Sequence, residues 1–120
     1  MNTESKEKDV CLCPLRGIIE IISKKWALHI IAIIGNHKKL RFNEIMKKLP
    51  GISPKALTDR LRELEAAGLI KREMFPEIPP RVEYSLTKDG LELRELIKPL
   101  MEWASSRTNI RCSVISESVC

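Results

Sequence analysis

The chain has 120 residues, of which 43% are hydrophobic and 31% are charged. These values are typical of one soluble globular domain with a single core, and they exclude an intrinsically disordered chain. Twenty-one lysines and arginines against sixteen acidic residues give a net charge of +5, which favours a polyanionic partner without proving one.

The first ten residues, MNTESKEKDV, lack the apolar stretch of a signal peptide, and we expect residues 1–12 to form a flexible tail. The longest apolar run, WALHIIAIIG, has about half of the ~20 residues that a membrane-spanning helix needs. The four cysteines show no zinc or disulfide spacing, and the C-x-C pair near the N-terminus is only a weak metal signal. We therefore predict a cytoplasmic protein with reduced thiols, no metal, no cofactor and no membrane segment.

Pro14 is suited to the first position of a helix, and isoleucines follow it at helical spacing as far as Ile22. This arrangement places Cys13 at the N-cap, where the helix dipole and nearby Arg16 should favour the thiolate and lower the pKa. Such a cysteine can sense oxidants or electrophiles. The alternative is a small buried thiol that only packs.

A second helix, expected to be mostly core like the first, should begin after a Ser23 cap and stop at Gly35. The segment NHKKLRF then predicts a turn and a short extended piece at residues 40–42. Asn43 can cap a short helix, EIMKKL, which ends at the Pro50–Gly51 pair.

Ser53 followed by Pro54 is a strong helix start, because the serine oxygen can accept a first-turn N–H and proline fits the first helical position. The helix that follows ends at Gly68. On a 3.6-residue period its leucines fall in one narrow sector, and its polar residues lie opposite or to one side. The leucines are Leu57, Leu61 and Leu64, and the polar residues are Lys55, Thr58, Asp59 and Arg62.

The two helices on either side of PGIS have the spacing of a helix-turn-helix. The major groove of B-DNA, about 12 Å wide, admits one helix and presents donors and acceptors that Lys, Arg, Thr and Asp can address. The first turns of such a helix meet base edges, and flanking arginines can clamp the backbone. The predicted DNA-binding residues are Arg41, Ser53, Lys55, Thr58, Asp59, Arg62 and Arg81. The alternative is an ordinary solvated helix face with intrahelical charge pairs.

After the helix that ends at Gly68, the apolar period changes from helical to alternating. This change predicts strands at residues 70–74 and 82–86 with a proline-rich tip, FPEIPP. A helix-turn-helix followed by a basic hairpin is typical of a winged helix, and the tip would place Arg81 against phosphates or the minor groove. We therefore predict a mainly α fold with a small β-hairpin (α+β), a winged helix-turn-helix domain over residues 13–104.

Thr87 is expected to cap a last helix, which Pro99 should kink or split. The apolar stripes of the first and last helices exceed what one small core should absorb, which predicts a homodimer on a palindromic or pseudo-palindromic operator. The candidates for the dimer interface are Ile18, Ile22, Leu100 and Trp103. Residues 105–120 have weak periodicity and are expected to form a C-terminal tail.

Across roughly residues 13–104 the chain resembles HxlR-type transcriptional regulators, which are related to MarR-like winged-helix repressors. The matching pieces are CPL at Cys13, KW at Lys25, RFNEI from Arg41, LPGISPKAL from Leu49, RLRELEAAGLI from Arg60 and PPRVEYSLT from Pro79. The resemblance implies a homodimeric DNA-binding regulator whose first and last helices form the dimer contact. It also supports redox or electrophile sensing by Cys13. Members usually carry a glycine where this chain has Lys24.

No enzymatic activity is expected, because the chain has no glycine-rich phosphate loop, no GxSxG and no HExxH motif. His29, on an isoleucine-rich helix, is expected to be structural. The competing hypothesis is a winged-helix module whose polar face binds another protein instead of DNA. That alternative predicts little salt dependence of binding and no protection of DNA.

Overall fold

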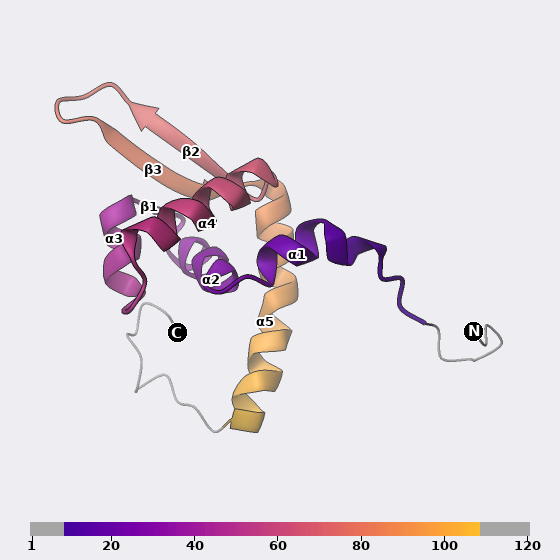
Figure 1. Ribbon diagram of the computed structural model, residues 1–120. Coiled ribbons are helices and arrows are strands. Elements are labelled where there is room, and N and C mark those ends of the chain that lie inside the picture. Colours follow the sequence, from indigo (N-terminus) through magenta and orange to yellow (C-terminus); the bar gives the residue numbers. More distant parts are fainter. Residues whose placement is uncertain (1–8, 109–120) are drawn as a thin grey trace.

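A computed structural model describes residues 9–108, so the predicted tails at residues 1–8 and 109–120 lie outside the described residues. The described part holds five α-helices, one short 3-10 helix and a three-stranded antiparallel sheet (Figure 1). In chain order these are η1 (Cys13–Arg16), α1 (Ile18–Ile22), α2 (Ala27–His37), β1 (Lys39–Leu40), α3 (Phe42–Lys48), α4 (Pro54–Ala66), β2 (Ile70–Phe75), β3 (Arg81–Leu86) and α5 (Lys88–Thr108). The predicted winged helix-turn-helix is confirmed.

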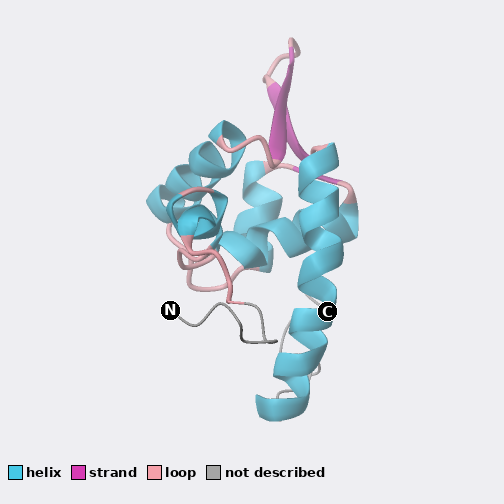
Figure 2. Cartoon of the chain, turned by 90° about the vertical axis from the view of Figure 1, so that its right-hand side faces the viewer, coloured by secondary structure: helices cyan, strands magenta, loops and turns pink. Residues whose placement is uncertain are grey.

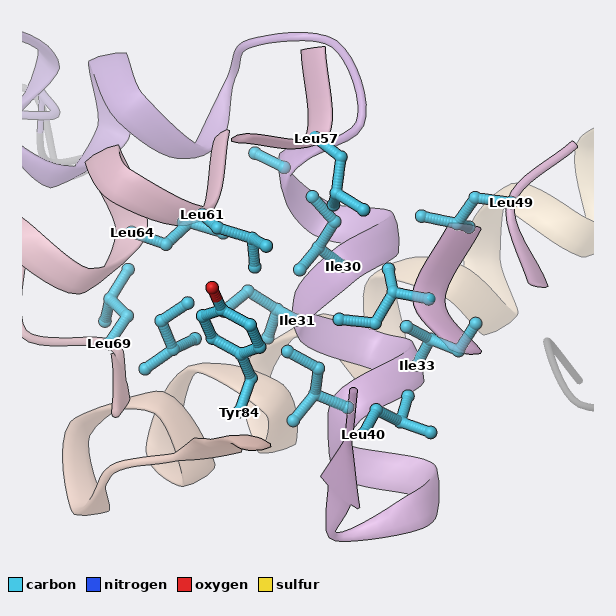
Figure 3. Packing of buried hydrophobic residues seen from close by; sticks show 14 of the residues in the cluster. Ile30, Ile31, Ile33, Leu40, Leu49, Leu57, Leu61, Leu64, Leu69 and Tyr84 are labelled. Atoms are coloured by element: carbon cyan, nitrogen blue, oxygen red, sulfur yellow. The ribbon is translucent and has the colours of Figure 1, made fainter. Parts of the chain in front are cut away.

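The core is built around α2, which is apolar on most of its surface and is packed against α3, α4, the sheet and α5. Its isoleucines at positions 30, 31, 33 and 34 are almost completely buried. The leucines of α4 point into the same cluster, together with Leu69 and Tyr84 (Figure 3). Since Leu57, Leu61 and Leu64 are all buried, the predicted apolar face of α4 is confirmed, and the core fixes which side of α4 faces outward.

The start of α4 is also as predicted. The side-chain oxygen of Ser53 accepts the backbone N–H of Ala56 at 3.0 Å, and Pro54 occupies the first turn. The predicted cap of α3 is wrong, because Arg41, two residues before Asn43, is the N-cap. The carboxylate of Glu44 accepts the backbone N–H of Arg41 at 2.7 Å, so a first-turn glutamate supplies the acceptor that the arginine lacks.

Both predicted ends of α2 are wrong. Ser23 ends α1, and α2 begins at Ala27 after Trp26, whose φ of 79° is left-handed. Gly35 does not stop the helix, which continues to His37. A Cβ atom at Gly35 would overlap the side chain of Arg94 on α5, so this glycine allows close packing of two helices and has no role as a helix terminator.

The helix α1 is shorter and more exposed than expected. It contains five residues, none of them buried, so the expectation that the first helix is mostly core is wrong. The helix begins only after Gly17, whose φ of −119° and ψ of −120° are not helical. A break at glycine therefore separates the turn that follows Pro14 from α1.

The hairpin predicted after α4 is confirmed, with β2 paired to β3 from Ile70–Leu86 to Phe75–Arg81. The short β1 adds to the other edge of β3, which gives the strand order β1-β3-β2. Figure 2 shows β2 and β3 projecting from the helical body at one end and the C-terminal part of α5 projecting at the other. The hairpin is the wing of the fold.

Thr87 joins the wing to α5 and caps that helix, as predicted. Its hydroxyl accepts the backbone N–H of Gly90 at 3.1 Å and donates to the carbonyl of Gly68 at 2.6 Å. Pro99 was predicted to kink or split the last helix, and it does not split it, since α5 is continuous from residue 88 to residue 108. The kink stays a prediction. Pro99 is exposed, so water can solvate the carbonyl that its ring leaves without a donor. The first four residues of the predicted tail, 105–108, are helical.

None of the helices in residues 9–108 is both long and apolar enough to cross a membrane.

Candidate nucleic-acid interface

The outer face of α4 carries the predicted base-reading residues on a helix whose opposite face is fixed in the core. Lys55 is exposed, and its ammonium group lies 2.9 Å from a carboxylate oxygen of Asp59, one turn later. This hydrogen bond, together with the charges of Lys55, Arg60 and Arg62, holds the pKa of Asp59 below its usual range. Asp59 thus stays ionised and orients Lys55. An exposed pair of this kind is worth about 0 to 1 kcal/mol, so DNA can readily displace it.

Arg62 and Arg41 differ from Lys55 in having no internal partner. Neither guanidinium group makes a hydrogen bond or an ion pair with another residue in the described part of the chain. Both side chains belong to exposed residues. An unpaired arginine on the exposed face of α4 and another at the start of α3 are suited to an anionic ligand, because binding it displaces no existing pair.

A groove of about 430 Å³ lies between α4 and the base of the wing. Two of the residues that line it, Leu61 and Tyr84, are 2% and 9% exposed. Residues from α3, α4, β2 and β3 line it, and they are Phe42, Thr58, Leu61, Arg62, Glu65, Arg72 and Tyr84. The structure thus brings the predicted residues Thr58 and Arg62 together with a cation of the wing, Arg72.

Arg81 lies at the tip end of β3, where its guanidinium group is already engaged. It lies 2.9 Å from a carboxylate oxygen of Glu77 and 3.1 Å from one of Glu83, and it stacks 4.0 Å from the ring centre of Phe75. Its Nε is buried and finds no hydrogen-bond partner in the described residues. The arginine therefore organises the wing tip, and its predicted contact with DNA stays a prediction.

The wing is not basic, contrary to the prediction. Residues 70–86 contain as many carboxylates as cations. The cations are Lys71, Arg72 and Arg81, and the carboxylates are Glu73, Glu77 and Glu83. Beyond Arg72 the hairpin has an excess of negative charge, because Arg81 is its one cation there. Its attraction for DNA must come from its base, next to α4.

The predicted position of Cys13 is also corrected. Cys13 is the first residue of η1, a four-residue 3-10 helix, and the N-cap of α1 is Gly17. The backbone N–H of Cys13, and then its thiol, donate hydrogen bonds to the sulfur of Cys11, which lowers the pKa of Cys11. Both cysteines are exposed. The pair is accessible to reagents, and the thiol that hydrogen bonds favour as thiolate is that of Cys11.

The segment between α1 and α2 contacts the helix-turn-helix at two places. The ammonium group of Lys24 lies 3.0 Å from a carboxylate oxygen of Glu63 on α4, and Arg60 donates to the same carboxylate. Desolvation opposes these bonds but does not cancel them, so the pKa of Glu63 is lowered. The ring of Trp26 lies beside Gly51, in the turn between α3 and α4. Sequence reasoning noted Lys24 as unusual but gave it no partner.

The dimer candidates lie on surfaces that a single chain leaves open. Ile18, Leu100 and Trp103 are 46%, 48% and 57% exposed, and Ile22 is half-buried. On the described part of α5, Leu96 and Met101 are exposed as well. These apolar side chains come from the two helices that were predicted to form the dimer contact.

The fold and the open polar face of α4 define a winged helix-turn-helix DNA-binding protein. Residues 21–111 match the HxlR-like helix-turn-helix family, and the chain belongs to that family. An uncharacterized HTH-type transcriptional regulator of Methanothermobacter thermautotrophicus is 42% identical over 95 residues, which cover 79% of this chain and 72% of the relative. The protein is thus a DNA-binding transcriptional regulator.

Two solved structures of similar chains are redox-related. The diamide-treated form of YodB from B. subtilis is 34% identical, with a TM-score of 0.65, over 74% of this chain and 87% of YodB. The redox regulator HypR in its oxidized form is 38% identical, with a TM-score of 0.68, over 78% of this chain and 94% of HypR. The redox chemistry is that of YodB and HypR themselves.

Proposed function

We propose that the protein is a cytoplasmic, homodimeric regulator in which each α4 enters the major groove of a palindromic or pseudo-palindromic operator. In this proposal Lys55, Thr58 and Arg62 address base edges, and Asp59 orients Lys55. The N-terminus of α4 at Ser53 attracts a phosphate. Arg41 contacts the DNA backbone, and Arg81 does so only with the part of its guanidinium group that Glu77 and Glu83 leave free.

One observation carries this proposal. The leucine face of α4 is buried, while on the opposite face of the same helix, in a helix-turn-helix, Lys55 and Arg62 are exposed and Thr58 and Asp59 are half-buried. A solvated face would also be open, but the unpaired guanidinium groups of Arg41 and Arg62 beside it favour an anionic partner. The proposal includes redox or electrophile sensing through Cys13, which the likeness to YodB and HypR supports.

The test begins with selection of bound duplexes from a random DNA pool, followed by binding measurements at several salt concentrations. Arg62→Ala should weaken binding of the selected duplex by about 1 to 3 kcal/mol and reduce the preference over random DNA. Lys98→Ala, which removes one exposed cation from α5, is the matched control and should change the preference little. If no duplex is enriched and binding to DNA does not depend on salt, the protein-interaction hypothesis replaces this one.

A further inference from the structure

The groove between α4 and the wing is lined by two arginines that form no ion pair with another described residue. Neither Arg62, from α4, nor Arg72, from β2, has a hydrogen bond or ion pair to any residue between 9 and 108. Other arginines nearby are satisfied, since Arg60 pairs with Glu63 and Arg81 with two glutamates. Two unpaired guanidinium groups lining one groove repel each other, and an anion between them would relieve that repulsion.

The pairing of the strands explains why Arg72 belongs to this groove. Arg72 lies directly opposite Tyr84 in the β2–β3 pair, and Lys71 lies opposite Ser85. Side chains of directly opposed residues share one face of a sheet, and successive residues alternate between faces. Arg72 therefore lies on the face of Tyr84, toward α4, whereas Lys71 lies on the other face.

We propose that this groove binds a phosphate of the DNA backbone and that Arg72 is the principal backbone contact of the wing. Arg62, on the other side of the groove, donates one N–H group to this phosphate while its other N–H groups address a base edge. The inference rests on α4 lying in the major groove, because the strand that borders that groove then passes between α4 and the base of the wing. Guanidinium groups bind phosphate oxygens in a bidentate manner. The hydroxyl group of Tyr84, which also lines the groove, can donate to a remaining oxygen.

The groove also contains one carboxylate, that of Glu65. It forms no ion pair with a described residue, and it would repel the phosphate. With this carboxylate present, either arginine alone would leave the groove without net charge. The two arginines together leave it with a net positive charge. Removing this carboxylate should therefore have the opposite effect on DNA affinity from removing Arg72.

The experiment measures affinity for one selected duplex at a series of potassium chloride concentrations for the full chain. Arg72→Gln should reduce the slope of log affinity against log salt by about 1. Lys71→Gln removes the same charge from the same strand but from the other face, so it controls for long-range electrostatics and should change the slope much less. Glu65→Gln should tighten binding. Thermal unfolding followed by circular dichroism checks that all three variants are folded.

A second readout locates the phosphate. The phosphates of the duplex are replaced one at a time by neutral methylphosphonates. At one position in each half-site this replacement should weaken binding of the parent protein, and it should not weaken binding of the Arg72→Gln variant any further. The inference is overturned if Arg72→Gln and Lys71→Gln change the slope alike, or if no position shows this dependence on Arg72. Those results leave the DNA-binding proposal intact, whereas a parent protein that binds no duplex would end both.

Discussion

Cys11 and Cys13 show how a side chain's chemistry depends on neighbours that a helical pattern does not reveal. The dipole of a helix starting at Pro14 was predicted to lower the pKa of Cys13, but Gly17 interrupts that helix. The pKa that is lowered is that of Cys11, which accepts hydrogen bonds from Cys13. A thiol with a lowered pKa is more ionised at neutral pH than an ordinary thiol, so Cys11 should react first with an electrophile.

This reactivity can be measured in a chain in which Cys112 and Cys120 are replaced by serine. At pH 7 the alkylation rate of Cys11, followed in the Cys13→Ser variant by mass spectrometry, should exceed that of a cysteine in an unstructured peptide. The excess should shrink as the pH rises through the ordinary thiol range, because the peptide then ionises too. Equal rates across that range would show that the hydrogen bond from residue 13 has no effect on Cys11.

The consequence for regulation is tested on DNA binding with single substitutions in a chain that keeps Cys112 and Cys120. Diamide should change the affinity of the parent protein for its duplex, and the change should be lost in Cys13→Ser if Cys13 is the sensor, as proposed. It should also be reduced in Cys11→Ser if Cys11 forms the initial thiolate. A response that survives both substitutions would move the sensor to Cys112 or Cys120, which lie outside the described residues.

Individual residues were predictable where a local rule decides their role. The Ser53 cap depends on a hydrogen bond three residues away, and the leucine face of α4 depends only on helical period. Arg81 was less predictable, because its partners Glu77 and Glu83 come together through the turn and the strand. Arg72 was missed because alternation along β2 indicates two faces but does not say which one α4 covers.

At the scale of elements, close approach of backbones explains where prediction of the boundaries failed. Gly35 looked like a helix stop, yet it provides space for Arg94, whose guanidinium group also donates to the side chain of Asn36 at 2.6 Å. The start of α2 also differs from its prediction at a place with a distant contact, since Trp26 has a left-handed φ and nearby Lys24 pairs with Glu63 on α4. Glycine and serine patterns indicate possible boundaries, and packing decides among them.

Gly90 provides a test of how α5 docks on the base of the wing. It is buried in the first turn of α5, and a Cβ atom there would overlap the carbonyl oxygen of Leu69. That oxygen also accepts the backbone N–H of Thr87 at 3.1 Å. Since backbone cannot move aside as a side chain can, Gly90→Ala should reduce the free energy of unfolding by about 1 to 3 kcal/mol.

Urea denaturation measures this change, with Lys88→Ala as the control. Lys88 is an exposed residue of the same helical turn, so its replacement should change the free energy of unfolding by less than about 0.5 kcal/mol. If Gly90→Ala is as stable as the parent, then α5 does not depend on close approach to Leu69 and the packing argument is wrong.

For the whole molecule, the distribution of apolar surface separates two ends with different roles. The end with α4 and the base of the wing carries unpaired cations, and α1 and the far part of α5 carry exposed isoleucine, leucine and tryptophan. Both surfaces were predicted from the sequence. Helical period indicated the polar face of α4, and the apolar residues of the first and last helices exceeded what one small core can bury. It could not show which stripe residues one chain buries, and Ile97 is in fact 4% exposed while its neighbour Leu96 is 70% exposed.

These exposed residues lead to the prediction that the protein is a dimer at micromolar concentration, as light scattering can establish. Leu100→Glu should produce a folded monomer, because it places a charge in the proposed contact and touches no core residue there. Leu91→Glu is the matched control. Leu91 lies on the same helix and is 52% exposed, compared with 48% for Leu100, but it lies near the wing end and should leave the dimer intact.

The dimer also determines how tightly the protein binds its operator. Two linked α4 helices bind half-sites about one helical turn, or 34 to 36 Å, apart, and the second half-site is then bound at high effective concentration. The monomeric Leu100→Glu variant should therefore lose roughly 10²-fold or more in affinity for a two-half-site duplex, while its affinity for a single half-site should match that of the parent. A parent protein that scatters light as a monomer, or a Leu100→Glu variant that remains a dimer, would show that the open faces of α1 and α5 serve a different contact.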